Sequence, residues 1–543
     1  MKRFLINMTL LLLLAGEFSS CKKTIADDYL NPELSTTGSM SKLLSGMFLN
    51  KRIHPSYYDF ATFIMPTTAA FSQTASLVPG ADMYVPSINY NEARWDDYYD
   101  GSMPSAGNGV DYNYNGPGIM SSYREMQTTY AALSAAEQAN QYVFLQCAKV
   151  LLYDQTAQMV DLWGDIPFSQ ANSLNVTRSI GLAPFDNQIA IYDTLIAGLQ
   201  QLNTYFSTAV LPSTISAEFK TQDILLNGSL AAWRRYANSL RLRLLMRTSY
   251  YDEATAKTQV TAMLADPTTY PMISDNSMNV LLNESPTALK SDLQSVLAPT
   301  PGSGTGGPVY APAYLLDTVM VANGDPRTAV YWDSVQDQPY TGFPVNGTVS
   351  QYQAGGFAVY DTATFIYNYN VPGVVFTAAE VSFLTAEANE RWNAGAGAIT
   401  AYQNGITQSV DFYYGINQSK VQKPNVTYSA NSLPTPSTAA IMAYYNSPNI
   451  VYSSSLTTAQ HLALIATQNW INFFILQAGQ AWAEIRRTGY PALTFAPANA
   501  TSGAIQPPTR LLYPSSEQLY NAVNYSAVSA KDTRSTKVFW DVK

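Results

Sequence analysis

Residues 377–415 read TAAEVSFLTAEANERWNAGAGAITAYQNGITQSVDFYYG, and this stretch predicts two consecutive α-helices. Thr377 and Glu380 have the spacing of a capping box, in which each side chain bonds the other residue's backbone N–H at the start of a helix. The first helix is expected to end near Asn393, and the second to reach Gly415 at its C′ position. Two helices joined by a few residues form an antiparallel hairpin.

Apolar residues recur every three or four positions in both helices and in other parts of the chain. In the quoted pair they are Val381, Phe383, Leu384, Ala388, Ile399, Tyr402, Ile406 and Val410. The same periodicity predicts helices over 186–206, with Asp186 as the N-cap, and over 229–250. Another hairpin is expected around 123–163. Helix pairs are the unit of tetratricopeptide-type packing, although the chain has no regular period of about 34 residues.

Long irregular segments separate the predicted helices. Residues 285–313, 418–437 and 494–509 are rich in Pro, Gly, Asn, Ser or Thr, and strand patterns are few and short. Long loops in a compact protein usually carry function or are disordered. The predicted fold class is therefore mainly α, with a tetratricopeptide-like scaffold of helix pairs and large loop-rich excursions.

The N-terminus has the pattern of a secretory signal peptide. Lys2 and Arg3 precede a leucine-rich run that is much shorter than the ~20 apolar residues of a membrane span. Small residues then lead to Cys21, so the cleavage site resembles a bacterial lipobox. We expect residues 1–20 to be removed, Cys21 to carry diacylglycerol and a palmitate-type acyl chain, and residues 21–40 to form a tether. The alternative is an ordinary signal peptide followed by an incidental cysteine.

The composition is that of a large globular protein: 543 residues, 47% hydrophobic and 13% charged. The formal net charge is −9, and loss of Lys2, Arg3 and Glu17 with the signal peptide makes it −9 − 1 = −10. An acidic chain without a basic stripe repels phosphate backbones, so nucleic acid is not an expected partner.

Cysteine and histidine give no sign of a metal site or a catalytic triad. Cys147 lies in a predicted helix, has no disulfide partner once Cys21 is lipidated, and is expected to be a small buried hydrophobe. His54 and His461 are the only two histidines, and neither has a recognisable local signature. We expect both to be structural, with no metal and no cofactor.

Tyrosine is unusually frequent: its 38 residues exceed the 30 Lys and Arg combined. Aromatic rings can stack on sugar faces while neighbouring amides bond the hydroxyl groups. On this reasoning the candidate ligand-binding residues are Tyr84, Trp95, Tyr98, Tyr99, Tyr310, Tyr314 and Trp332. The competing interpretation is that Trp95 and one of the tyrosines anchor a loop to the core.

Five short motifs occur in a characteristic order along the chain. They are DLWGDIPF (161–168), WRRYANSLRLR (233–243), VVFTAAEV (374–381), AWAEIRRTGYP (481–491) and RLLYP (510–514). Each has a structural explanation, with Trp163, Trp233 and Trp482 as core anchors and Gly489 in the left-handed position that ends a helix. Together with the lipobox, they resemble the SusD-like (RagB/SusD) outer-membrane nutrient-binding lipoproteins.

The resemblance implies a single SusD-like domain over residues 41–543. Such proteins are surface-exposed lids, anchored to the outer membrane by lipid alone, over a TonB-dependent, SusC-like barrel. They capture oligosaccharides, or peptides in some members, for transport, and they perform no covalent chemistry. A loop-rich face carries ligand recognition in this family.

Two other classes of function remain open from the residues alone. A surface glycoside hydrolase would need a pair of carboxylates, for which Asp96, Asp97, Glu380 and Glu387 are candidates. A purely structural scaffold would bind the barrel and no nutrient.

Overall fold

The chain is mainly helical, as the sequence predicts. The computed structural model describes residues 39–80, 83–101, 117–177, 181–283, 292–298, 309–335, 338–421, 432–497 and 504–543. The predicted signal peptide, Cys21 and nearly all of the predicted tether lie outside these residues. In the described ranges, none of the helices combines the length and the apolar character needed to cross a membrane.

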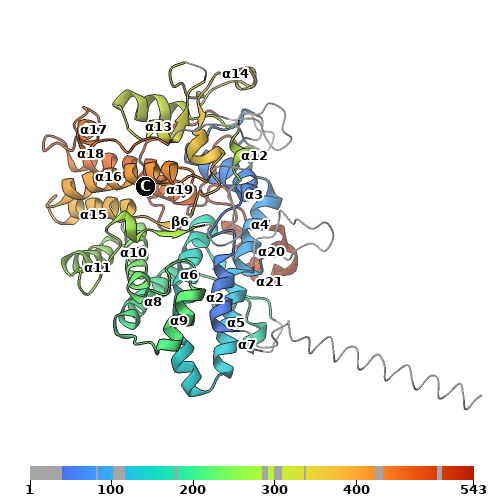
Figure 1. Cartoon of the computed structure of the whole chain (residues 1–543). Coiled ribbons are helices and arrows are strands. Elements are labelled where there is room, and N and C mark those ends of the chain that lie inside the picture. Colours follow the sequence, from blue (N-terminus) through green and yellow to red (C-terminus); the bar gives the residue numbers. More distant parts are fainter. Residues whose placement is uncertain are drawn as a thin grey trace, which may run out of the picture.

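Four long helices form the cyan and green part of the molecule (Figure 1). They are α5 (Ile119–Ala132), α6 (Ala135–Trp163), α8 (Gln188–Thr208) and α10 (Leu230–Thr248). Helix α5 packs on α6, and α8 packs on α10. The hairpin expected around 123–163 is therefore confirmed, and Ser134 and Glu137 form a capping box at its second helix.

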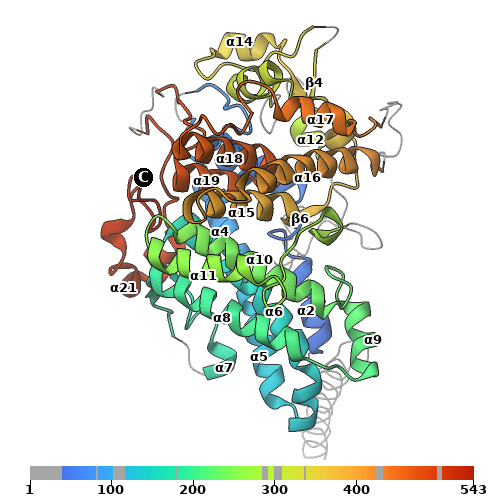
Figure 2. The same ribbon diagram turned by 90° about the vertical axis from the view of Figure 1, so that its left-hand side faces the viewer.

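A second group of helices lies above the first in Figure 2. It contains α15 (Ala378–Trp392), α16 (Ala398–Gln418), α18 (Thr458–Phe473) and α19 (Ala478–Thr488). Helix α15 packs on both α16 and α18, and α18 packs on α19. The helical hairpin of the quoted stretch is thus confirmed, and it forms the centre of this group.

Shorter helices surround the two groups. They are α2 (Met40–Phe48), α3 (Tyr57–Asp59), α4 (Ile88–Tyr99), α7 (Leu174–Thr177), α9 (Ser213–Gln222), α11 (Glu253–Ala265), α12 (Gln294–Leu297), α13 (Thr328–Tyr331), α14 (Val349–Ala354), α17 (Thr438–Tyr445), α20 (Ser515–Tyr520) and α21 (Ala522–Tyr525). Helices of other geometry are η1 (Phe60–Ala69), η2 (Asn276–Met278), η3 (Tyr314–Met320), η4 (Val321–Asn323), η5 (Thr362–Ile366) and η6 (Ser529–Lys531).

The strands are few and short, again as predicted, and those of the described residues pair antiparallel in twos. The pairs are β1 (Ile166–Pro167) with β2 (Phe185–Asp186), β3 (Val280–Leu282) with β6 (Gly373–Phe376), and β4 (Trp332–Asp333) with β5 (Val359–Tyr360). Strand pairing therefore joins only short segments of the chain, whereas helix packing forms the body.

Half of the predicted capping box at α15 is wrong. Thr377 Oγ1 does accept a hydrogen bond from the Glu380 N–H at 3.3 Å. The Glu380 carboxylate, however, accepts from Arg243 Nε and Nη2 at 2.5 and 2.6 Å. Both side chains are buried, and a buried guanidinium is strongly destabilising unless an opposite charge pairs with it, so Glu380 pairs with Arg243 rather than with the helix end.

Two predicted helix ends also differ from the structure. Asn187, rather than Asp186, caps α8, because the Asp186 carboxylate instead accepts from the backbone N–H groups of Phe168 and Ser169. Gly415 does not end its helix, which continues to Gln418. The extra turn is stabilised by tertiary burial, since Asn417 is fully buried there.

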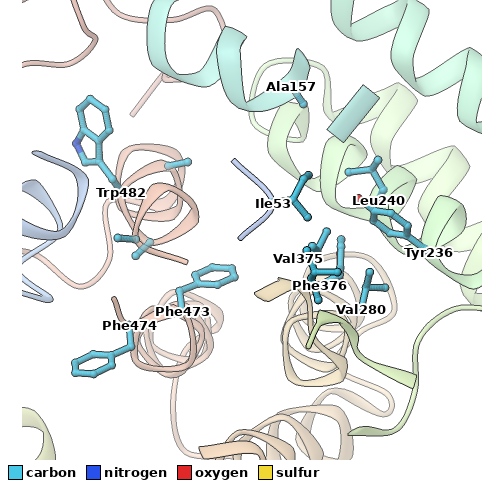
Figure 3. Packing of buried hydrophobic residues seen from close by; sticks show 14 of the residues in the cluster. Ile53, Ala157, Tyr236, Leu240, Val280, Val375, Phe376, Phe473, Phe474 and Trp482 are labelled. Atoms are coloured by element: carbon cyan, nitrogen blue, oxygen red, sulfur yellow. The ribbon is translucent and has the colours of Figure 1, made fainter. Parts of the chain in front are cut away.

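The core contains the three tryptophans predicted as anchors. Trp163 and Trp233 are fully buried, and Trp482 is 2% exposed. In Figure 3, Ile53 lies between the Val375 end of β6 and the helices that carry Phe473 and Trp482. One core therefore joins the two helix groups through a segment from the N-terminal part of the chain.

The isolated cysteine and the histidines occupy buried positions. Cys147 is a free, fully buried thiol, as predicted. His461 lies 3.0 Å from the Glu390 carboxylate and stacks on Tyr452 at 3.9 Å between ring centroids. His54 is also buried. Among the described residues, no group of three or more His, Cys, Asp or Glu side chains is placed to hold a metal ion.

The arginine-rich motif of α19 is explained by a buried ion network. Arg487 donates to Glu387 at 2.8 Å and to Glu484 at 2.6 Å. Gly489 then takes the left-handed conformation, with φ +75°, and ends the helix as predicted. Arg487 of this motif therefore connects α19 to α15. The motif has a structural role in the fold and does not form a ligand site.

Candidate ligand-binding site

An open cavity of about 380 Å³ lies where four segments far apart in the sequence meet. Its described lining comes from residues 70–80, Met83 and residues 312–314, 343–347 and 496–497. Among the described residues of this lining none is charged, and the polar groups are hydroxyls and amides. Such a surface suits a neutral ligand that presents both apolar faces and hydrogen-bonding groups.

The first wall follows helix η1 and turns sharply at Gln73. This residue has φ +50°, and its side-chain Nε2 donates to the Thr494 carbonyl at 2.6 Å. Trp470 Nε1 donates to the carbonyl of Ser72 at 2.7 Å, and Ser76 Oγ accepts from the Tyr310 N–H at 3.2 Å. The turn is therefore bonded to the other segments of the cavity.

The second wall is the loop around Phe343. Phe343 exchanges backbone hydrogen bonds with the neighbouring segment, donating to the Ala311 carbonyl at 2.7 Å and accepting from the Ala313 N–H at 2.9 Å. A Cβ at Gly342 would collide with the Ala313 backbone, and one at Gly347 would collide with the Phe343 ring. Only glycine allows these close approaches.

Tyr314, the first residue of η3, presents an aromatic ring to the cavity. Its side chain is 36% exposed, and its ring centroid lies 6.2 Å from that of Trp470 at an angle of 40°. Partial burial raises the pKa of its hydroxyl, so the ring stays neutral at physiological pH. The exposed amide of Asn346 lies on the same lining.

One family model matches most of the chain. Residues 89–514 match a SusD-like family model described as starch-binding associating with outer membrane. The chain belongs to the SusD-like family. The family resemblance inferred from the five motifs is thereby confirmed, and the family description associates its members with glycan binding and the outer membrane.

Solved structures agree with this assignment at the level of the fold. A chitin-binding protein has 21% sequence identity and a TM-score of 0.70, with 93% of this chain and 100% of that chain covered. A chitin-binding SusD homologue from Flavobacterium johnsoniae has 21% identity and a TM-score of 0.68, with 93% and 99% covered. A SusD homologue from Bacteroides fragilis has 18% identity and a TM-score of 0.68, with 93% and 100% covered. A search of curated proteins gives no match.

The structure exposes only one of the seven aromatic residues predicted to bind ligand in this SusD-like chain. Tyr314 is 36% exposed, whereas the exposed fractions of the other six range from 0 to 8%. Those six are Tyr84, Trp95, Tyr98, Tyr99, Tyr310 and Trp332. Stacking on a sugar requires an accessible ring face, so in this conformation only Tyr314 offers one.

The aromatic residues of α4 are held by core neighbours. The Trp95 ring packs against Trp163 and Tyr513, with centroids 5.3 and 6.0 Å away. Tyr99 Oη donates to the Pro167 carbonyl at 2.7 Å, and the Tyr98 hydroxyl lies 2.7 Å from Thr156 Oγ1. The competing interpretation of the sequence, in which these residues anchor a segment to the core, matches this geometry.

Tyr84 and Tyr310 support the cavity from behind. Tyr84 Oη donates to the carbonyl of Ala496, a lining residue, at 2.6 Å. The Tyr310 ring packs on Phe343, with ring centroids 6.0 Å apart. Trp332 lies deeper, 4.8 Å from Tyr360 between centroids, and does not line the cavity.

Sequence reasoning missed most of the lining. Residues 70–80 and 343–347 were not predicted to contribute to the lining. Pro344 and Gly347 are typical turn residues, and they were the available sequence signal for a loop there. The irregular segments 285–313 and 494–509 are predicted to be functional or disordered loops, and Pro312 and Ala496 from them line the cavity.

The carboxylates considered for a hydrolase do not lie in this cavity. Glu380 and Glu387 are buried and paired with Arg243 and Arg487. Asp96 is exposed on α4, and its pKa is raised to about 6 by partial burial and by neighbouring acidic residues. The described lining contains no Asp or Glu, and therefore no pair of carboxylates.

Proposed function

We propose that this SusD-like protein binds a neutral oligosaccharide in the cavity beside Tyr314 and does not alter it covalently. The supporting observation is an uncharged, open cavity with one exposed tyrosine ring, in a chain whose family is described as starch-binding. The Tyr314 ring would stack on a sugar face, while the exposed amide of Asn346 would bond its hydroxyl groups.

The proposal extends to nutrient uptake at the cell surface. The protein would be held on the outer membrane by lipid on Cys21 and would pass its ligand to a TonB-dependent, SusC-like barrel. A Cys21→Ala variant should then leave the membrane fraction, and purification in mild detergent should recover a barrel with the parent protein. Retention of the variant on membranes would contradict the anchor, and recovery of the parent without a barrel would contradict the complex.

Calorimetry with defined oligosaccharides tests the binding site. Chitin oligosaccharides are the first probe, since two similar structures carry chitin-binding in their names, and starch oligosaccharides are the second. Removing a stacking ring should cost about 1–3 kcal/mol, so Tyr314→Ala should weaken binding roughly 5- to 150-fold. Tyr520→Ala is the matched control, because Tyr520 is 77% exposed outside the cavity and its loss should leave affinity unchanged.

The same samples separate binding from hydrolysis. Oligosaccharide length should stay constant during long incubation, and shortened products would favour the glycoside hydrolase. Binding of peptides in place of every glycan would favour the peptide-binding alternative within the family. Equal affinities of the parent and Tyr314→Ala would place the glycan site elsewhere.

A further inference from the structure

A second cavity lies at the junction of the two helix groups. It has a volume of about 80 Å³ and shares no lining residue with the cavity beside Tyr314. Segments from η1, α4, α6, β6 and the start of α19 surround it. Ile53 and Val375, both on its lining, lie close together in Figure 3.

Two buried arginines on this lining have N–H groups without an acceptor. Arg52 donates from Nε to Gln155 Oε1 at 3.0 Å and from Nη1 to the Arg94 carbonyl at 2.8 Å, but Nη2 has no acceptor among the described residues. For Arg94, both Nε and Nη1 lack one in the same part of the chain. The two residues are only 5% and 8% exposed.

Helix α19 begins at the same cavity. Its first residues, Gln477 to Gln480, are all on the lining, no side chain caps its N-terminus, and its first turn contains no acidic residue. Within the described ranges, the amide N–H groups of Ala478 and Gly479 have no hydrogen-bond acceptor. The N-terminus of a helix carries a partial positive charge and binds anions readily.

The local charges leave the arginines incompletely neutralised. Asp97 Oδ2 is 3.8 Å from Arg94 Nη1, a distance too long for a hydrogen bond, and Asp59 acts on Arg94 from further away. Burial, and next the charge of Arg94, lower the pKa of Arg52 well below its ordinary value. Desolvated cations in this state are unfavourable unless an anion or ordered water satisfies them.

The one acidic residue on the lining already has partners. Asp161 Oδ1 accepts from Tyr192 Oη at 2.5 Å and from Trp540 Nε1 at 2.8 Å, and its Oδ2 lies 3.4 Å from Arg247 Nε. Its charge is therefore directed largely at groups other than Arg52 and Arg94. Gly479 is exposed, so solvent ions have a route to the cavity.

We infer that this cavity binds a small oxyanion, held by Arg52, Arg94 and the N-terminal amides of α19. Phosphate, sulfate and a carboxylate group share the required chemistry, because each accepts several N–H donors around one centre. The volume accommodates about two or three water molecules or one such ion, and it is too small for a sugar. The bound ion would join the two helix groups electrostatically.

Thermal unfolding at constant ionic strength tests this inference. Phosphate, sulfate, acetate and chloride are titrated separately, and a ligand that binds only the folded protein should raise Tm by about 1–3 °C near saturation. Phosphate and sulfate also stabilise proteins generally by exclusion from the surface. The informative quantity is therefore the difference between variants at equal anion concentration.

Arg94→Met removes the cation while nearly conserving volume, and it should abolish the specific increase in Tm. Arg241→Met is the matched control, since Arg241 is also buried, and its Nε and Nη1 likewise lack acceptors among described residues, but it does not line the cavity. This control should keep the increase. Because Arg94→Met must fold to be informative, calorimetry of the parent protein with phosphate and a crystal structure with selenate provide independent measurements.

The anion site is supported if phosphate, sulfate or acetate stabilises the parent and Arg241→Met but not Arg94→Met, and if selenium density lies between Arg52, Arg94 and Ala478. The anion that raises Tm at the lowest concentration identifies the chemical class of the natural ligand. Equal Tm increases in all three proteins, or only water in the cavity at saturating selenate, would overturn the inference.

Discussion

Helix α4 and the first turn of η3 both contain aromatic residues that the sequence predicts to bind ligand, but the structure places these residues in different environments. Trp95, Tyr98 and Tyr99 of α4 lie near asparagines and aspartates, yet they are at most 8% exposed. Tyr314 follows a loop rich in Pro and Gly, and it is 36% exposed. Polar neighbours in the sequence therefore do not indicate that an aromatic ring is accessible.

The neighbours that decide burial come from distant parts of the chain. Trp95 is covered by Trp163 and Tyr513, whereas Tyr314 meets Trp470 on one side and the open cavity on the other. Variants in the two regions should therefore separate stability from ligand affinity.

Trp95→Ala should have the largest effect, on stability. Truncating a buried tryptophan costs about 3–5 kcal/mol, since the lost contacts leave a cavity in the core. We expect a matching loss of unfolding free energy in urea denaturation, with glycan affinity nearly unchanged in the remaining folded protein. Normal stability with lost affinity would instead make α4 part of the ligand site.

Acidification should also lower the free energy of unfolding through a buried histidine, while the hydroxyl of Tyr314 stays neutral. Burial, with the nearby Lys51 charge, lowers the pKa of His54 from 6.5 to about 4. Between those values the unfolded chain takes up a proton that the folded chain does not. His54 therefore contributes stability above pH 6.5 that is lost as the pH falls to 4, up to about 3 kcal/mol.

Comparison with His54→Gln isolates this contribution. Asp361 acts in the opposite sense over the same range, because burial and Asp333 raise its pKa to about 7, but it is present in both proteins. The difference in unfolding free energy between parent and variant should thus change between pH 6.5 and 4. A constant difference would show that His54 is protonated in the folded protein.

Gly347→Ala should affect the cavity more than the core. The added methyl group would press on the Phe343 ring, and overpacking of this kind costs about 1–3 kcal/mol. We expect a moderate loss of stability together with weaker glycan binding. Gly80→Ala is the matched control, because Gly80 lines the same cavity with open space at its Cβ position and should tolerate the methyl group. Equal effects of both variants on calorimetric affinity would contradict the role of the Phe343 loop.

Removing single hydroxyl groups should give the smallest effects. Tyr98→Phe loses a buried hydrogen bond to Thr156, worth about 0.5–1.5 kcal/mol of stability, and should not change glycan affinity. Tyr314→Phe should leave stability unchanged and keep the stacking surface. Denaturation and calorimetry on both variants check the pair, and a stability loss in Tyr314→Phe alone would reverse the assignment of buried and exposed rings.

The helix pairs were predictable from sequence because apolar periodicity is a local property. Details at helix ends were less predictable, since distant partners compete for the same groups. Glu380 is drawn to Arg243, 137 positions away in the sequence, and Asp186 is drawn to the backbone at Phe168. Local capping rules contain no information about these partners.

The candidate site was predictable only in part, for a related reason. Two predicted irregular segments and one of the seven candidate aromatic residues, Tyr314, lie on the cavity lining. The segments were predictable because loop composition is visible in the sequence. The burial of Trp95 depends on Trp163 and Tyr513, which no short window contains. The Phe343 loop was missed because its role depends on backbone bonds to Ala311 and Ala313.

The close packing at Gly342 and Gly347 has a consequence for how the protein can change over generations. These two glycines and Phe343 fix the loop to its neighbour, whereas Val345 and Asn346 between them are exposed on the cavity lining. Mutations at the two exposed positions alter what the cavity contacts without disturbing how the loop is held. Under the proposed function, ligand preference can therefore diversify in a lineage while the scaffold stays the same.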